Sequence, residues 1–179
     1  MSKRIRLWLI AALALCAAAA VGVTLSFMFK KAEKTNTFVP AEVTCKVEES
    51  LLSGVKSDVC VENTGNVAAY LRIRLVSYYV YDNGSIAGRV SSQYPTLTLR
   101  NGWIAGADHT YYYSTPVEPG AETGILCAPI TLDTVELADG KTVYQVLEVF
   151  AEAIQAEPVR AVQEAWNVTV SGTEITPAT

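Results

Sequence analysis

The stretch VCVENTGNVAAYLRIRLVSYYVY, residues 59–81, has the most regular alternation of side chains in this chain. Leu71, Ile73 and Leu75 alternate with tyrosine and arginine residues, which predicts a β-strand with one face on a core and one in water. The preceding Asn63–Asn66, with the sequence Asn-Thr-Gly-Asn, predicts a tight connection, because asparagine and glycine tolerate positive φ. Together the two features favour a fold built from strands.

Similar patterns recur along the rest of the chain, separated by turn residues. The expected strands are 43–48, 58–62, 70–81, 96–100, 111–115, 125–132, 143–155 and 167–170. A loop is expected at 51–54. One short helix is expected from Pro158, because Val159, Val162 and Trp166 are spaced i, i+3, i+7. We therefore expect an all-β fold, an antiparallel β-sandwich with one short helix near the C-terminus.

The N-terminus begins with the basic segment Met1–Arg6, which is followed by the uncharged apolar run Leu7–Phe29. This order is typical of a secretory signal peptide, and the run is also long enough to span a membrane as a helix. We expect signal peptidase to cut between Ser26 and Phe27, because Thr24 and Ser26 are the small residues that such a site requires. Retention as a membrane anchor through 7–29 is the alternative.

Four segments are expected: a signal peptide or anchor at 1–26, a flexible arm at 27–39, a β-sandwich domain at 40–171 and a polar tail at 172–179. Cleavage would remove three cations and change the formal net charge from −4 to −7. Such an acidic exported domain has no electrostatic attraction for nucleic acid. Membrane contact is therefore expected only through the N-terminal segment.

Cys45, Cys60 and Cys127 follow the N-terminal segment, and an odd number of cysteines does not form a complete disulfide set. Cys45 shares a strand face with apolar residues, whereas Cys60 shares one with acidic residues and is expected to be exposed. A bridge between them would need both sulfurs on one face. We expect isolated thiols that behave as small apolar side chains, with intermolecular pairing through Cys60 as the alternative.

His109 is the single histidine of the sequence, which excludes a His-Glu-x-x-His zinc protease. The cysteines lack the close spacing of a zinc site, and no glycine-rich phosphate loop is present. We expect His109 to lie in a solvent-exposed loop. The sequence thus predicts no catalytic residue, no cofactor and no metal site.

The aromatic residues offer a different possibility, a platform for binding sugars. The candidates are Tyr78, Tyr79, Tyr81, Trp103, Tyr111, Tyr112 and Tyr113. Packing within the sandwich and at its rims is the favoured interpretation, because no aspartate or asparagine partners are spaced among them.

Several stretches, in the same order along the chain, resemble the TasA/camelysin-like secreted matrix proteins that carry a SipW-type signal peptide. They are TLSF and TNTF at 24–27 and 35–38, VENTGNVAAYLRIRL at 61–75, YYYSTPVEPGAET at 111–123 and EVFAEAIQAEPVRAVQEAW at 148–166. The resemblance implies a jelly-roll-like sandwich, export from a Gram-positive-type cell and a role in extracellular matrix or fibres, without a catalytic set. The chain departs from the family at 27–31 and in its three cysteines.

An exported cell-surface or matrix subunit of a biofilm, fibre-forming or fibre-associated, is therefore the expected function. Its arm, anchored by Phe27, Phe29 and Phe38, is expected to pair with an exposed strand edge of another copy or of a related matrix subunit. The alternative is a membrane-tethered module that binds a glycan or a peptide.

Overall fold

The computed structural model describes residues 40–177. The expected cleavage residues Ser26 and Phe27 lie outside this range, as do the arm residues Phe29 and Phe38. Within 40–177, no helix is long and apolar enough to cross a bilayer.

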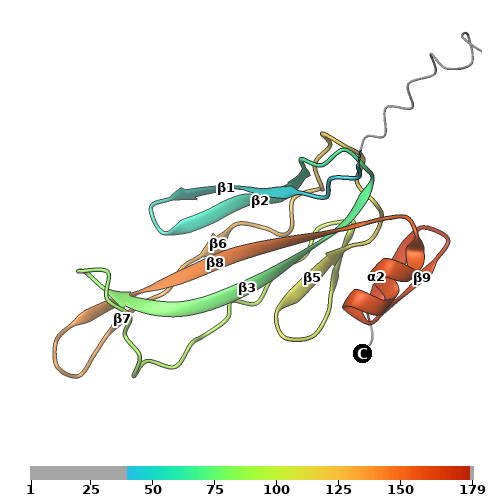
Figure 1. Cartoon of the computed structure of the whole chain (residues 1–179). Coiled ribbons are helices and arrows are strands. Elements are labelled where there is room, and N and C mark those ends of the chain that lie inside the picture. Colours follow the sequence, from blue (N-terminus) through green and yellow to red (C-terminus); the bar gives the residue numbers. More distant parts are fainter. Residues whose placement is uncertain (1–39, 178–179) are drawn as a thin grey trace, which may run out of the picture. The chain divides into compact units, whose positions relative to one another are not determined.

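The larger of the sheets has five strands in the order β4-β5-β3-β8-β7, all antiparallel (Figure 1). Its centre is a long two-stranded ribbon of β3, Ala69–Tyr81, and β8, Thr142–Gln155. The shorter strands are β4, Trp103–Ala105, β5, Thr110–Tyr113, and β7, Thr134–Glu136. The two long strands were both predicted: β3 alternates apolar and polar residues over most of its length, and β8 has one continuous apolar face, with Val146, Phe150 and Ile154 among the glutamates of the other.

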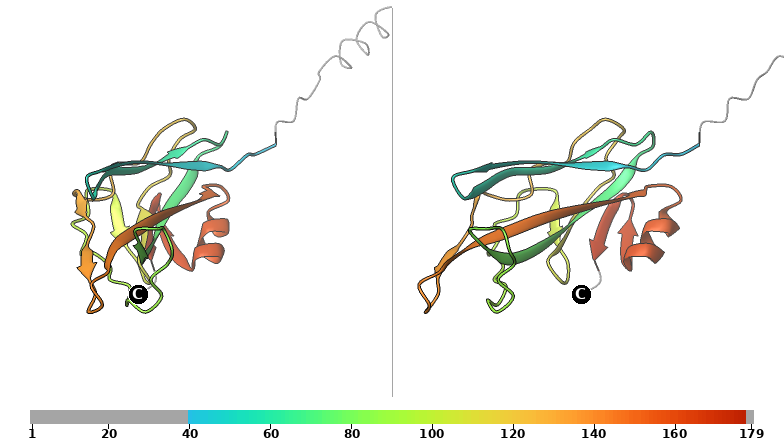
Figure 2. Two further views of the ribbon diagram at one scale, coloured as in Figure 1. Left: turned by 90° about the vertical axis from the view of Figure 1, so that its left-hand side faces the viewer. Right: turned by 60° about the vertical axis from the view of Figure 1, so that its left-hand side comes forward.

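The second sheet has three strands in the order β1-β2-β6 and lies across one face of the first (Figure 2). Its strands are β1, Cys45–Leu52, β2, Val55–Asn63, and β6, Ile130–Thr131. The main core fills the space between the two sheets and includes Val59, Val61, Leu71, Ile73, Leu75, Leu126 and Leu147. The predicted antiparallel β-sandwich is therefore confirmed.

β1 and β2 form a hairpin that extends further than the sequence predicts. Leu51 and Leu52 continue β1, so the loop expected at 51–54 is wrong in its first half. The turn consists of Ser53 and Gly54, both with positive φ, at 50° and 76°. Two consecutive residues of this kind form the tight turn that suits the twist of a hairpin.

Two other predicted strands are shorter in the structure. The expected strand at 96–100 makes a single bridge, between Leu99 and Cys127. The one expected at 125–132 forms β6 near its end, while Leu126 donates a backbone hydrogen bond to Val59. Local alternation was present in both segments, but long neighbouring strands were lacking, so no extended ladder forms.

The C-terminal part covers the outer face of the β3–β8 ribbon at one end. It consists of α2, Val159–Trp166, β9, Val168–Ser171, and β10, Glu174–Pro177. A second apolar cluster holds it there, formed by Tyr70, Tyr112, Ala156, Val162, Trp166, Val168 and Ile175. The predicted helix and the predicted strand after it are confirmed.

The polar tail expected at 172–179 is wrong, because residues 174–177 form β10 as a hairpin with β9. Ile175 is 1% exposed and its backbone N–H donates to Ser114. A single apolar side chain among polar ones carries little periodicity, so the sequence pattern did not reveal this strand.

Candidate functional site

One edge of β8 is open over most of its length. β3 pairs with the other edge along the whole strand, whereas β7 covers only Thr142–Tyr144. Beyond the hydrogen bond from Gln145 N–H to Asp133, no strand within 40–177 pairs with this side. Hydrogen bonds alternate between the two sides of an antiparallel strand. The N–H and C=O groups of Leu147, Val149, Ala151 and Ala153 are therefore directed to the open side.

β1 has a second open edge, because β2 pairs with one of its sides and no described strand pairs with the other. β1 and β8 have Cα atoms within 8 Å of each other. Toward the hairpin turn they enclose a groove of about 470 Å³. We call this groove the seam; its lining includes Glu49, Leu51 and Lys56 from the hairpin and Leu147, Val149 and Phe150 from β8.

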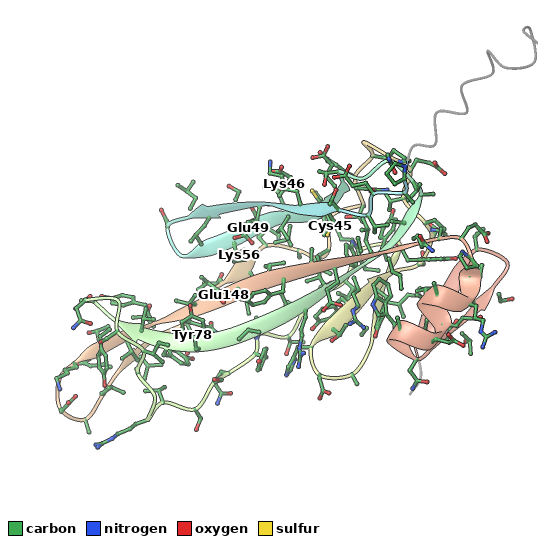
Figure 3. The ribbon with its side chains drawn as sticks, viewed as in Figure 1. Cys45, Lys46, Glu49, Lys56, Tyr78 and Glu148 are labelled. Carbon is green, nitrogen blue, oxygen red and sulfur yellow. The ribbon has the colours of Figure 1, made fainter. Side chains whose placement is uncertain are left out.

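The seam combines apolar side chains exposed to solvent with a buried ion pair. Phe150 is 50% exposed and Leu51 60%, although both strands belong to the core layers. Lys56 is only 4% exposed, and its ammonium lies 2.7 Å from a carboxylate oxygen of Glu49 (Figure 3). An open backbone edge beside exposed apolar side chains is the arrangement that accepts an added strand.

The Asn63–Asn66 motif holds the chain segment that leads into β1. The N–H of Thr64 donates to the Thr44 carbonyl and that of Asn66 to the Glu42 carbonyl, while Glu42 N–H donates to the Asn66 side chain at 2.7 Å. The fully buried Asn63 amide donates to two carbonyls, those of Val67 and Val117. Residues 42–44 are thereby fixed in an extended conformation in line with β1.

Gly65 is needed in this motif for a reason other than the predicted one. Its φ does not lie in the left-handed region, so the expectation of positive φ is wrong there. A Cβ at this position would stand 2.3 Å from the Glu42 carbonyl oxygen. The close approach of two backbones excludes a side chain, and it requires the glycine.

The three thiols are separate and free within the described range. Cys60 is 8% exposed, so its predicted exposure is wrong. It pairs in register with Glu48, and its sulfur lies 3.9 Å from a carboxylate oxygen of Glu122. These longer side chains flank the small thiol on the acidic face and shield it.

Burial raises the pKa of all three thiols. For Cys60 the carboxylates of Glu122 and Glu48 add to the effect, and for Cys45 that of Glu152 does. For Cys127 burial raises the pKa, and Arg100 partly opposes the rise. Each thiol is thus held in its protonated, weakly nucleophilic form.

His109 lies in a turn with positive φ, and its ring stacks on Tyr94 with centroids 3.4 Å apart. Among residues 40–177, no group of three or more histidine, cysteine, aspartate or glutamate side chains is placed to hold a metal ion. His109 is exposed to solvent, as predicted.

The seven aromatic residues do not form a common platform. Tyr79, Trp103 and Tyr112 are buried, and Tyr111 and Tyr113 pack against the main core. The hydroxyl of Tyr78 donates to Glu148 on the outer face of the ribbon. Tyr81 is different, because it lines a hollow at the end of the ribbon opposite α2.

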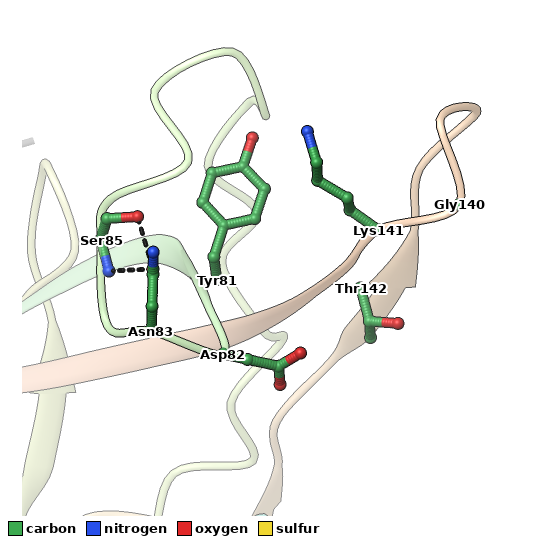
Figure 4. Close-up of a pocket in the computed structure, with 7 residues that line it drawn as sticks. All are labelled: Tyr81, Asp82, Asn83, Ser85, Gly140, Lys141 and Thr142. Carbon is green, nitrogen blue, oxygen red and sulfur yellow. Dashed lines mark hydrogen bonds between the residues drawn. The ribbon is translucent and has the colours of Figure 1, made fainter.

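This hollow, which we call the end pocket, has a volume of about 590 Å³ and lies between the β3 turn and the start of β8 (Figure 4). Its lining residues are Tyr81, Asp82, Asn83, Ser85, Gly140, Lys141 and Thr142. This pocket was not predicted from the sequence, because the two segments that form it are far apart in the chain. The sequence feature that could have indicated the pocket is the Asp-Asn dipeptide directly after Tyr81, which places polar side chains beside an aromatic ring.

Comparison of the chain with family models, with curated proteins and with solved structures finds no match in any of the three. The similarity to the TasA/camelysin-like proteins therefore stays a prediction from the motifs alone.

Proposed function

We propose that the protein is an exported structural subunit of a cell surface or extracellular matrix, in which the arm of one copy adds as a strand to another copy. The observation that carries the proposal is the open edge of β8 beside the seam. The acceptor is the stretch 146–155, which spans about 33 Å at about 3.3 Å per residue. The arm 27–38 would have a similar extended length.

Backbone geometry supports β8 as the acceptor. The four residues directed to its open side, Leu147, Val149, Ala151 and Ala153, have inward-facing side chains that contribute to the main core. An added strand would satisfy their N–H and C=O groups, and its apolar side chains would cover the partly exposed apolar ones. Phe27, Phe29 and Phe38 are the arm residues suited to that burial.

Charge favours the same partner. The arm contains three lysines and one glutamate, whereas the seam carries the carboxylates of Glu49 and Glu148 against the single ammonium of Lys56, which pairs with Glu49. A cationic segment and an acidic edge attract each other during encounter, and salt weakens the attraction.

The Asn63–Asn66 motif favours pairing between copies over pairing within one copy. It fixes residues 42–44 in line with β1 through hydrogen bonds on both sides of Gly65. For its own arm to lie beside β1, the chain would have to reverse direction at this point and break those bonds. Head-to-tail addition to a neighbouring copy gives open filaments instead.

The test compares chains that begin at Phe27 and at Val39 by negative-stain electron microscopy. We expect filaments from the longer chain and dispersed particles from the shorter one. A synthetic peptide of residues 27–38 should bind the shorter chain, and a peptide of scrambled sequence should not. Filaments formed equally well without the arm would contradict the proposal.

A further inference from the structure

The end pocket contains one aromatic ring among hydrogen-bonding side chains. Apart from Tyr81 and Gly140, every residue that lines it has a polar or charged side chain. Its volume of about 590 Å³ falls within the range of small-molecule sites. A ligand that fits this lining has many hydroxyl groups and one apolar face for the tyrosine ring.

The ring of Tyr81 is held firmly. Tyr81 forms a register pair with Val143 and packs against a small apolar cluster that contains Tyr79 and Ala87. The backbone N–H of Tyr81 donates to the Ser85 carbonyl at 2.9 Å. The ring is therefore a preformed surface, which lowers the entropy lost when a ligand stacks on it.

The turn beside the ring is also preorganised. The side-chain oxygen of Asn83 accepts from the backbone N–H of Ser85 at 3.0 Å and from its hydroxyl at 2.7 Å. This leaves the amide NH₂ group of Asn83 to donate to a ligand. The carboxylate of Asp82 points away from the Tyr81 ring (Figure 4) and raises the pKa of Tyr144 instead.

The pocket carries few charges. The lining holds the carboxylate of Asp82 and the ammonium of Lys141. That ammonium lies 6.0 Å from the centroid of the Tyr81 ring and is paired with Asp139 at 2.9 Å. Because Asp139 already neutralises Lys141, the pocket offers no strong attraction for an anionic ligand.

We propose that the end pocket binds a sugar residue of a neutral polysaccharide, with its ring stacked on Tyr81 and a hydroxyl bonded to the side-chain amide of Asn83. This activity is independent of strand addition, because the seam is formed by different residues. A protein with both sites would attach a matrix polysaccharide to a protein polymer.

Affinity electrophoresis of the full-length chain tests the proposal. Native gels would contain a β-1,3-glucan, an α-1,6-glucan or a galactomannan, with chitohexaose as a soluble competitor in a further series. We expect one of the polysaccharides to slow the migration of the protein, and a sugar that occupies the same pocket to reverse this effect when added in solution. Tyr81→Ala should weaken the interaction about tenfold, and Tyr81→Phe should preserve it.

Tyr78→Ala is the matched control, because Tyr78 lies on the same strand, outside the pocket, with its hydroxyl on Glu148. It should bind as the unmodified chain does. Absence of binding to every probe would overturn the proposal. Equal binding by Tyr81→Ala and Tyr78→Ala would overturn it as well.

Discussion

The two ends of the β3–β8 ribbon have the same strand pairing but different surroundings. At one end α2, β9 and β10 cover the outer face, and Trp166 is 9% exposed. Phe150, on the same face of β8 but beyond the cover of α2, is 50% exposed and lines the seam. The covered end is built for stability, whereas the open end keeps apolar surface and unpaired backbone, as binding sites do.

The largest expected effect is that of Trp166→Ala at the covered end. The Trp166 ring contacts Tyr112 edge-on, with centroids 5.8 Å apart, and the Arg72 guanidinium lies 4.6 Å above it. Its removal should lower the free energy of unfolding by about 3–5 kcal/mol, measured by urea denaturation. Phe150→Ala, on the uncovered part of the same face, is the control and should cost less than about 1 kcal/mol. Equal losses would remove the distinction between the two ends.

Glu49→Gln examines the ion pair in the seam. It leaves the ammonium of the buried Lys56 without its carboxylate, and we expect a loss of about 2 kcal/mol in the free energy of unfolding. In the Glu49→Gln/Lys56→Met double variant, where no unpaired charge is left, most of this loss should be recovered. If the single variant is as stable as the original chain, the ion pair between Glu49 and Lys56 does not stabilise the fold.

Gly65→Ala examines the connection that fixes the start of β1. The added Cβ would meet the Glu42 carbonyl oxygen at 2.3 Å, so we expect thermal unfolding to show a destabilisation of about 1–3 kcal/mol. Gly88→Ala is the matched control, because a Cβ there has no atom within 4 Å and its φ is not in the left-handed region. Its stability should be unchanged. A harmless Gly65→Ala would show that the two segments are not tightly joined.

The smallest effect concerns the thiols. Because the pKa values of Cys45, Cys60 and Cys127 are raised, the folded protein should react slowly with iodoacetamide at neutral pH, relative to the chain in urea. The unfolded chain releases thiol protons at lower pH than the folded one. The folded state is therefore favoured while the thiols are protonated. The free energy of unfolding should fall as the pH rises above the ordinary thiol pKa. Fast alkylation of the folded protein at pH 7 would contradict the burial of these groups.

The sequence predicted the elements that depend on local periodicity. β3 alternates over most of its length, β8 has one continuous apolar face, and α2 has its apolar residues one turn apart, so these three were found with nearly correct limits. β10 was missed because Ile175 is its sole buried side chain, and burial of one residue depends on tertiary contacts.

The candidate sites were predicted only in part. Pairing through an exposed strand edge was expected, but which edge is open depends on the order of strands in the sheets, which periodicity does not determine. The end pocket brings Tyr81 next to Lys141 across the ribbon, a proximity set by the β3–β8 register. The exposure of Cys60 was wrong, because alternation assigns a face and says nothing of the long side chains that flank a small one.

Hydrogen–deuterium exchange along β8, compared between the chain that begins at Val39 and the assembled longer chain, tests the central claim most directly. In the shorter chain, the amides of Leu147, Val149, Ala151 and Ala153 should exchange rapidly, while those of Glu148, Phe150 and Glu152, which bond to β3, stay protected. Assembly should protect the first group as well. If those four amides exchange as rapidly in the assembly as in the shorter chain, the open edge of β8 is not the surface through which copies join.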